Sequence, residues 1–170
     1  MPIYSGSQKQ KTLYVGNQKI KEAWTLVGGV MRKVYSSFTP VGMMKSGSSS
    51  TVSSGSLKLV TGMVADPAFA GSTVSSNGVT ILQSKSDATI TISVNCSNNF
   101  TTTVTVAAYK NGAQIGTTLT RTGGSGTFTI AGPVTGTGAA VTAGDVITLM
   151  ASAANGTTTI NVADTFLNVT

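Results

Sequence analysis

Residues 88–96 read ATITISVNC and residues 102–109 read TTVTVAAY, and these two stretches decide the fold class of the chain. In both of them, apolar residues largely alternate with Thr, Ser or Asn. A period of two places successive side chains on opposite faces of a strand, so that one face is buried and the other meets solvent. Val, Ile and Thr also suit the pleated surface of a sheet. The pattern therefore predicts strands and not helices.

Similar stretches recur outward from this pair, with turn residues between them. The dipeptides Asn77-Gly78 and Asn111-Gly112 accept positive φ and can close tight turns, and Asp145 can cap the turn before the segment VITLM. We predict strands at residues 57–64, 79–83, 89–96, 102–109, 113–120, 126–130, 146–151 and 158–169, the last of which can be broken. About eight short strands at this spacing are typical of an antiparallel sandwich or jelly roll. The predicted fold class is all-β.

The composition agrees with one folded core and an appendage. The chain has 170 residues, of which 40% are hydrophobic and only 9% are charged, so it is too apolar and too weakly charged to be disordered throughout. A single core of ordinary size accounts for most of this length. The one cysteine, Cys96, is in phase with Ile90, Ile92 and Val94. We therefore expect a small buried side chain at Cys96 and no internal disulfide.

The positive charge of the chain lies near its start. Residues 1–45 hold seven Lys or Arg residues against Glu22, whereas residues 46–170 hold four basic and four acidic residues. Residues 46–56, SGSSSTVSSGS, have the composition of a flexible linker. The sequence thus predicts three parts: a docking arm at residues 1–45, a linker at residues 46–56 and a head at residues 57–170.

The docking arm contains a weak internal repeat. Val15-Gly16 and Val27-Gly28 are each followed by basic residues and then by an aromatic residue, a pattern typical of a β-hairpin. Because an isolated hairpin is marginally stable in water, we expect the arm to dock on a partner surface. The aromatic and basic residues that we predict to make this contact are Tyr14, Trp24, Arg32, Lys33 and Tyr35.

The sequence offers little catalytic chemistry. Without any histidine, neither a Ser-His-Asp triad nor a Cys-His pair can form, and the commonest zinc ligand is missing. The five carboxylates have no calcium-loop spacing, although a pair of them could still converge in space as in a glycosidase. We predict no enzyme, and hence no catalytic residue, no metal and no cofactor.

Two further partner classes are not expected. The basic arm could suit phosphate contacts, but it lacks the run of five or six like charges found in nucleic-acid-binding tails. We therefore expect its cations to lie on solvated strand faces or to contact an acidic neighbour. Membrane insertion is not expected either, because no segment approaches about 18 consecutive apolar residues and the start of the chain lacks the apolar stretch of a signal peptide.

Four segments of the C-terminal part resemble a known family: residues 77–96 (NGVTILQSKSDATITISVNC), 104–112 (VTVAAYKNG), 141–153 (VTAGDVITLMASA) and 159–170 (TINVADTFLNVT). In their order they resemble the globular heads of the complement and tumour-necrosis-factor (TNF) superfamily, including its bacterial and phage relatives. The turn motifs of that family fall on Lys110, Asn111 and Gly112 and on Ala143, Gly144 and Asp145.

This resemblance implies a ten-strand jelly roll that assembles as a homotrimer. The aromatic residues that we take as candidates for the trimer contact or the core are Tyr109, Phe128 and Phe166. The chain has fewer aromatic residues than such trimers usually pack, so we expect Val, Ile, Thr or Met to line the trimer axis.

Residues 26–38, LVGGVMRKVYSSF, resemble a different element, a Val-Gly-Gly-x-Trp-Lys-like repeat near the start of phage tail and other virion proteins. Met31 stands where that element usually has an aromatic residue. Both resemblances imply a virion, assembled in the host cytoplasm, as the setting of the protein.

The first hypothesis for function is a phage virion structural protein. In it, a minor tail or tail-tip protein docks on other virion proteins through the arm, and its trimeric head contacts the host surface. A capsid decoration or head-fibre protein is the alternative. A carbohydrate-binding adhesin module, with a host-surface glycan as its ligand, is the second alternative.

Overall fold

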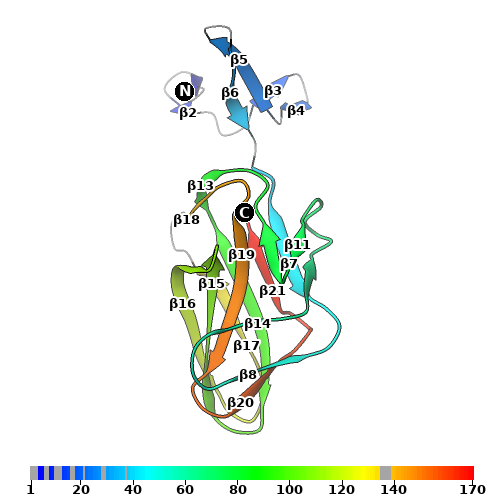
Figure 1. Cartoon of the computed structure of the whole chain (residues 1–170), viewed down its shortest axis with the longest axis vertical. Coiled ribbons are helices and arrows are strands. Elements are labelled where there is room, and N and C mark those ends of the chain that lie inside the picture. The colour runs from blue at the N-terminus through cyan, green and yellow to red at the C-terminus, as the bar shows by residue number, and fades with distance from the viewer. Residues whose placement is uncertain are drawn as a thin grey trace. The chain divides into compact units, whose positions relative to one another are not determined.

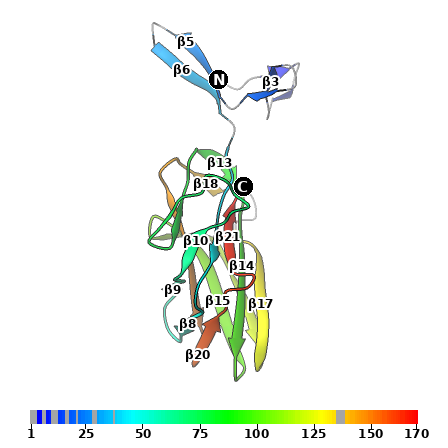
Figure 2. The same cartoon turned by 90° about the vertical axis from the view of Figure 1, so that its right-hand side faces the viewer.

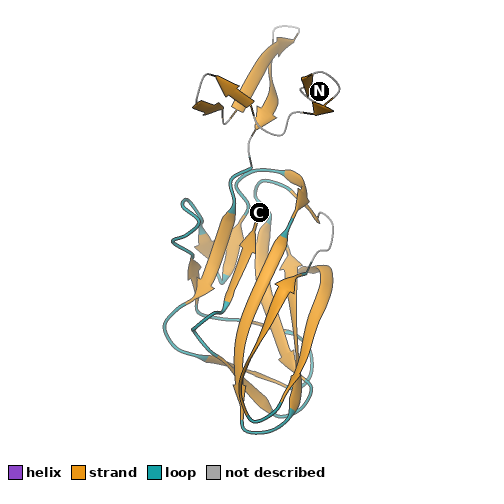
Figure 3. Cartoon of the chain, turned by 180° about the vertical axis from the view of Figure 1, so that it is seen from behind, coloured by secondary structure: helices purple, strands orange, loops and turns teal. Residues whose placement is uncertain are grey.

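The structure is a computed structural model that divides the chain into two compact units, Met1–Thr39 and Pro40–Thr170, which we call the N-terminal unit and the C-terminal unit. It describes residues 38–134 and 139–170. Before residue 38 it describes only the backbone of six strands. All of the regular structure in these residues is strand (Figure 3).

The six strands of the N-terminal unit pair two by two. Their bounds are β1 (Tyr4–Ser5), β2 (Gln8–Lys9), β3 (Leu13–Val15), β4 (Gln18–Ile20), β5 (Glu22–Val27) and β6 (Val30–Ser36). β1 pairs with β2, β3 with β4, and β5 with β6, each time antiparallel. The sequence thus correctly predicted a hairpin arm, and β5 and β6 form its longest pair.

Seven strands form the first sheet of the C-terminal unit (Figure 1). They are β7 (Val41–Lys45), β8 (Ser50–Ser53), β10 (Met63–Ala65), β14 (Ile90–Asn98), β17 (Gly126–Pro133), β20 (Thr157–Ile160) and β21 (Phe166–Val169). β14 is central, because it pairs with β17 along one edge and with β21 and then β20 along the other. β7 pairs with β21, so the start of this unit lies beside the C-terminus of the chain.

Six strands form the second sheet, which faces the first as the other layer of a sandwich (Figure 2). They are β9 (Lys58–Leu59), β11 (Val74–Ser75), β12 (Gly78–Thr80), β15 (Thr102–Lys110), β16 (Ala113–Gly123) and β19 (Val146–Ala153). A small separate pair joins β13 (Lys85–Ala88) to β18 (Ala139–Val141). All of these pairings are antiparallel, and the crossing connections between the two sheets make the sandwich a jelly roll, as predicted.

The core lies between the two sheets and consists of the inward half of each alternating strand. Its fully buried aliphatic side chains include Val41, Met43, Ile90, Ile92, Val94, Leu167 and Val169 from the first sheet and Val79, Val104, Val106, Ile147 and Leu149 from the second. Burying each side chain of this size stabilises the fold by about 1.5–3 kcal/mol relative to an exposed position. Cys96 is buried among them as a free thiol, as predicted.

The predicted boundaries of the arm and the linker are corrected by the structure. Residues 41–45 belong to the C-terminal unit, and the predicted linker 46–56 contains β8, which pairs with β20 from Ser50↔Ile160 to Ser53↔Thr157. Val52 points inward and is 2% exposed. A Ser/Thr-rich segment can form this strand because its backbone hydrogen bonds come from a segment about a hundred residues later in the chain.

The structure changes the bounds of two predicted strands and the position of one predicted turn. The predicted strand 158–169 is broken into β20 and β21, whereas the predicted strand 57–64 is replaced by the short β9 and β10. Asn111-Gly112 forms the expected positive-φ turn. The turn before β12 lies one residue earlier than predicted, at Ser76 and Asn77, and Gly78 begins the strand. Gly78 is required there by space, because a Cβ would lie 2.5 Å from Val146 Cγ1.

Candidate functional site

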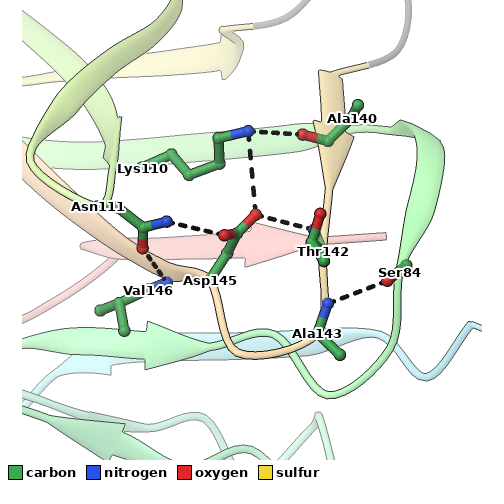
Figure 4. Close-up of polar contacts among 8 residues, drawn as sticks. All are labelled: Ser84, Lys110, Asn111, Ala140, Thr142, Ala143, Asp145 and Val146. Atoms are coloured by element: carbon green, nitrogen blue, oxygen red, sulfur yellow. Dashed lines mark hydrogen bonds and ion pairs between the residues drawn. The ribbon is translucent and has the colours of Figure 1, made fainter.

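The two predicted turn motifs lie side by side in the structure and form one polar cluster (Figure 4). Lys110 ends β15, Asn111 and Gly112 make the turn into β16, and Ala143 and Gly144 lie in the turn before β19. Gly144 has φ +94, a value that glycine adopts without strain. Asp145 closes this second turn, and its N–H donates to Thr142 O at 3.0 Å.

Asp145 is the centre of the polar cluster. Its carboxylate accepts hydrogen bonds from Thr142 N and from Asn111 Nδ2, both at 2.8 Å, and Lys110 Nζ lies 3.9 Å from Asp145 Oδ2. The hydrogen bond from the Thr142 backbone is the largest cause that lowers the pKa of Asp145, followed by the Asn111 amide and the Lys110 charge; burial acts in the opposite direction. The carboxylate is therefore held in its charged form.

Three further hydrogen bonds complete the cluster. Asn111 Oδ1 accepts from Val146 N at 2.8 Å, and Lys110 Nζ donates to Ala140 O at 3.0 Å. Ser84, which sequence reasoning missed, accepts from Ala143 N at 3.1 Å through its hydroxyl oxygen. Only its position between two strands could have signalled this role. The cluster thus joins the β15–β16 turn to the start of β19, which is a structural role.

The three predicted aromatic candidates do not come together. Phe128 is 8% exposed and belongs to the core, whereas Tyr109 is half-buried on the second sheet between Thr148 and Gln114. Phe166 is half-buried on the outward face of the first sheet, because its neighbour Leu167 points inward. Of the three aromatic residues, Phe166 alone therefore lies on the outward face of the first sheet.

An apolar row surrounds Phe166 on that outward face. Val64, Met44 and Phe166 are direct cross-strand partners on β10, β7 and β21. Val64 is 43% exposed. The ring of Phe69 covers Gly42, the next outward position of β7, where a Cβ would lie 2.5 Å from Phe69 Cδ2. We call Val64, Met44, Phe166 and Phe69 the apolar patch; the sequence pattern did not reveal it, because its members come from four separate segments.

The other half of the same outward face is polar. The partners Thr51, Thr159, Ser97 and Thr127 form a hydroxyl row across β8, β20, β14 and β17. Beside this row, Asn161 Nδ2 donates to Asn95 Oδ1 at 2.7 Å. The first sheet therefore presents an apolar half and a hydroxyl and amide half.

Lys45 is the one charged residue of the described chain that is almost fully buried. It is 1% exposed, and its Nζ donates to Thr61 O at 2.6 Å. Burial lowers the pKa of Lys45. Within residues 38–134 and 140–170, no carboxylate lies within 4.0 Å of this amine.

The predicted docking residues lie on three strands of the N-terminal unit. Tyr14 is on β3, Trp24 is on β5, and Arg32, Lys33 and Tyr35 are on β6. In the β5–β6 register, Trp24 pairs with Lys33, and Tyr35 pairs with Ala23 across an irregularity. Tyr14 belongs to the separate β3–β4 pair. The side chains of these five residues lie outside the described part of the structure.

The described residues show no grouping of three or more Cys, Asp or Glu side chains that could hold a metal ion. None of the described segments forms a helix of the length and hydropathy needed to cross a membrane.

The fold of the chain was compared with those of known proteins. No protein-family model and no curated protein matches the chain. Among solved structures, the chain is similar to Eiger TNF from S. frugiperda, with a TM-score of 0.52 and 12% identity, covering 78% of this chain and 90% of that chain. It is also similar to the PRD1 vertex protein P5, with a TM-score of 0.47 and 12% identity, covering 99% of this chain and 96% of that chain. A likeness at this identity establishes a fold and not a function. The C-terminal unit is an antiparallel jelly roll of the TNF-like kind, as its sequence motifs predicted.

Proposed function

We propose that the chain is a structural protein of a phage virion, in which the N-terminal unit anchors it to the particle and the C-terminal unit is displayed as a trimeric head. The placement that we favour is a minor tail or tail-tip protein that contacts the host surface. The alternative is a capsid decoration or head-fibre protein. The observation that carries the proposal is the division of the chain into two compact units of different character.

The N-terminal unit has the character of an anchor. Its described strands occur only in two-stranded pairs, which are marginally stable by themselves. Residues 1–39 hold six Lys or Arg residues against Glu22, whereas residues 40–170 hold five against four Asp residues. Such a unit gains stability by adding its strands or aromatic side chains to a neighbouring protein. The resemblance of residues 26–38 to an element of phage tail proteins favours a virion protein as this neighbour.

Reattachment to particles tests the anchor. Virions that lack the protein are mixed with the purified full chain, and bound chain is measured after sedimentation. The double variant Trp24→Ala, Tyr35→Ala should remain in the supernatant, whereas the control Thr25→Ala, Ser36→Ala on the same hairpin should bind like wild type. Binding of the Trp24, Tyr35 variant at wild-type level would remove the anchoring role of this hairpin.

The position on the particle and the host contact have separate tests. Gold-labelled antibody against the chain should mark the tail end of virions in electron micrographs; label on the capsid would select the decoration or head-fibre alternative. Virions that lack the protein should adsorb more slowly to host cells if the head contacts the host. Glycan-array binding by the full chain would support the adhesin alternative.

The apolar patch supports a homotrimer. Val64, Met44, Phe166 and Phe69 place apolar side chains together on the outward face of a sheet that has no second layer on that side within the described chain. Apolar surface of this kind is stabilised when another subunit covers it. A second and a third copy of the chain are the covering partners that the TNF-like fold favours.

Light scattering tests the assembly and its surface together. Wild type should scatter as three times the 17.2 kDa mass of the chain. Val64→Lys should give a monomer, whereas Leu59→Lys on the second sheet should stay trimeric. Val64 and Leu59 are 43% and 37% exposed, so both variants should fold. A monomeric wild type would overturn the trimer, and a trimeric Val64→Lys would overturn the proposed surface.

A further inference from the structure

The chain contains three Asn-Gly dipeptides: Asn77-Gly78, Asn111-Gly112 and Asn155-Gly156. In such a dipeptide the backbone nitrogen of the glycine can attack the side-chain carbonyl of the asparagine, because no Cβ on the glycine blocks the approach. The reaction requires the asparagine side chain to turn toward that nitrogen. The hydrogen bonds of each side chain in the folded chain therefore affect how readily it can turn toward that nitrogen.

Two of the three side chains are held away from this reaction. Asn111 uses both ends of its amide, since Oδ1 accepts from Val146 N and Nδ2 donates to Asp145 Oδ1, each at 2.8 Å. Asn77 Oδ1 accepts from Gly62 N at 2.8 Å and from Met63 N at 3.1 Å. Each of these side chains must break two hydrogen bonds before it can turn toward its own glycine.

Asn155 differs from both, because its main chain is held while its side chain is free. Asn155 N donates to Thr102 Oγ1 at 3.3 Å, and Thr102 Oγ1 donates to Asn155 O at 3.2 Å. The residue is exposed, and its side-chain amide makes no hydrogen bond within residues 38–134 and 140–170. Gly156 O accepts from Ser54 N at 3.1 Å, while no hydrogen bond from Gly156 N is formed in the same part of the chain.

We propose that Asn155 is the deamidation site of the folded protein, a role independent of any virion function. The nitrogen of Gly156 forms a bond to Cγ of Asn155, and the side-chain nitrogen leaves as ammonia, taking up the proton lost from the Gly156 amide. The product is a five-membered succinimide ring. Solvent water then opens the ring at either carbonyl, leaving aspartate or isoaspartate at position 155. No electrons are gained or lost overall.

The modification has a local structural consequence. Either product places a negative charge beside Thr102 at the start of β15, and isoaspartate also lengthens the main chain by one methylene. The longer main chain shifts the N–H and the carbonyl of residue 155, which are hydrogen-bonded to Thr102. It also shifts the carbonyl of Gly156, which is hydrogen-bonded to Ser54. The end of β8 and the start of β15 are therefore loosened together as the protein ages.

Peptide mapping by mass spectrometry tests the proposal on the full folded chain. After incubation at mildly alkaline pH, well below the unfolding temperature, the peptide with Asn155 should deamidate on the order of tenfold or more faster than those with Asn77 and Asn111, because each of the latter must first break two hydrogen bonds. In concentrated denaturant the three rates should converge. In Asn155→Gln the folded chain should gain almost no charge heterogeneity over the same period.

Two results would overturn the assignment. One is deamidation of Asn77 or Asn111 in the folded chain at the rate of Asn155. The other is an intact Asn155 in the folded chain under conditions in which the denatured chain reacts. Because all three dipeptides lie in one molecule, each sample contains its own controls.

Discussion

Removal of the Asp145 charge should destabilise the C-terminal unit in a pH-dependent way. Asp145→Asn keeps the size of the side chain and one carbonyl oxygen, so it can keep one of the two hydrogen bonds from Thr142 N and Asn111 Nδ2. Its new NH₂ group then faces the other donor, so the second hydrogen bond is lost. A hydrogen bond to a charged acceptor contributes about 1.5–3 kcal/mol, and the Asp145 side chain is only 14% exposed, so solvent replaces it poorly.

The ion pair adds less to this loss. Lys110 Nζ lies 3.9 Å from the carboxylate, and its own side chain is 34% exposed. Pairs of this kind contribute about 0.2–1 kcal/mol. The free energy of unfolding should therefore fall by about 2 kcal/mol in Asp145→Asn, which lowers the melting temperature of a domain of this size by about 6–10 °C.

The pH dependence gives a second readout of the same variant. Because the pKa of Asp145 is lowered below its ordinary value of 3.8, the unfolded chain binds this proton more tightly than the folded chain. The stabilisation is therefore complete above pH 3.8 and is lost as the pH falls through the lower folded-state pKa. The difference between wild type and Asp145→Asn should be full at pH 7 and should shrink in strong acid.

The assay is urea unfolding followed by far-ultraviolet circular dichroism at one fixed protein concentration, because assembly also shifts apparent stability. The only tryptophan, Trp24, belongs to the N-terminal unit, so circular dichroism is chosen in place of tryptophan fluorescence to follow the unfolding of the sandwich. Asp87→Asn, at an exposed position, is the control and should change stability by less than about 0.5 kcal/mol. An unchanged stability of Asp145→Asn at pH 7, or a loss that persists undiminished in acid, would refute the reasoning.

Three further predictions concern the core. Gly123→Ala should lower the free energy of unfolding by about 1–3 kcal/mol, because its Cβ would overlap the Phe128 ring, whereas Gly124→Ala should be near neutral by the same urea assay; equal effects would contradict this. Burial lowers the pKa of Lys45, so the wild-type free energy of unfolding should rise as the pH increases toward 10.5. Lys45→Met should lack this rise in urea titrations between pH 7 and 10. Equal slopes of unfolding free energy against pH in the two proteins would argue against the buried amine. Burial raises the pKa of Cys96 to about 12, so maleimide at pH 7.5 should label this thiol only after unfolding, and rapid labelling of the native chain would be inconsistent with its burial.

Local pattern was sufficient for some of the strands and turns of the sandwich. The alternation in residues 88–96 predicted β14, which extends to Asn98, and the Asn111-Gly112 dipeptide predicted the turn between β15 and β16. These features depend on the period of side chains along one strand and on the φ values of two residues, which are properties of the sequence itself. The burial of Cys96 was predictable for the same reason.

The sequence pattern failed where a segment depends on distant partners. Residues 46–56 have the composition of a linker, yet Ser50–Ser53 forms a strand because β20 supplies its hydrogen bonds, and residues 41–45 join the sandwich because β21 does the same. Motif resemblance identified Asn111 and Asp145, but the Asn111–Asp145 hydrogen bond joins residues 34 positions apart, and no local pattern encodes it.

The sequence by itself thus determined the all-β class, the central strands, the Asn111-Gly112 turn and the concentration of positive charge before the sandwich. Tertiary structure alone decided where the C-terminal unit begins, which outward faces are apolar, and which of the three Asn-Gly side chains makes no hydrogen bond within the described residues. The physical reason is that strand periodicity and turn geometry are short-range properties, whereas burial and hydrogen bonding are completed by residues that only folding brings together.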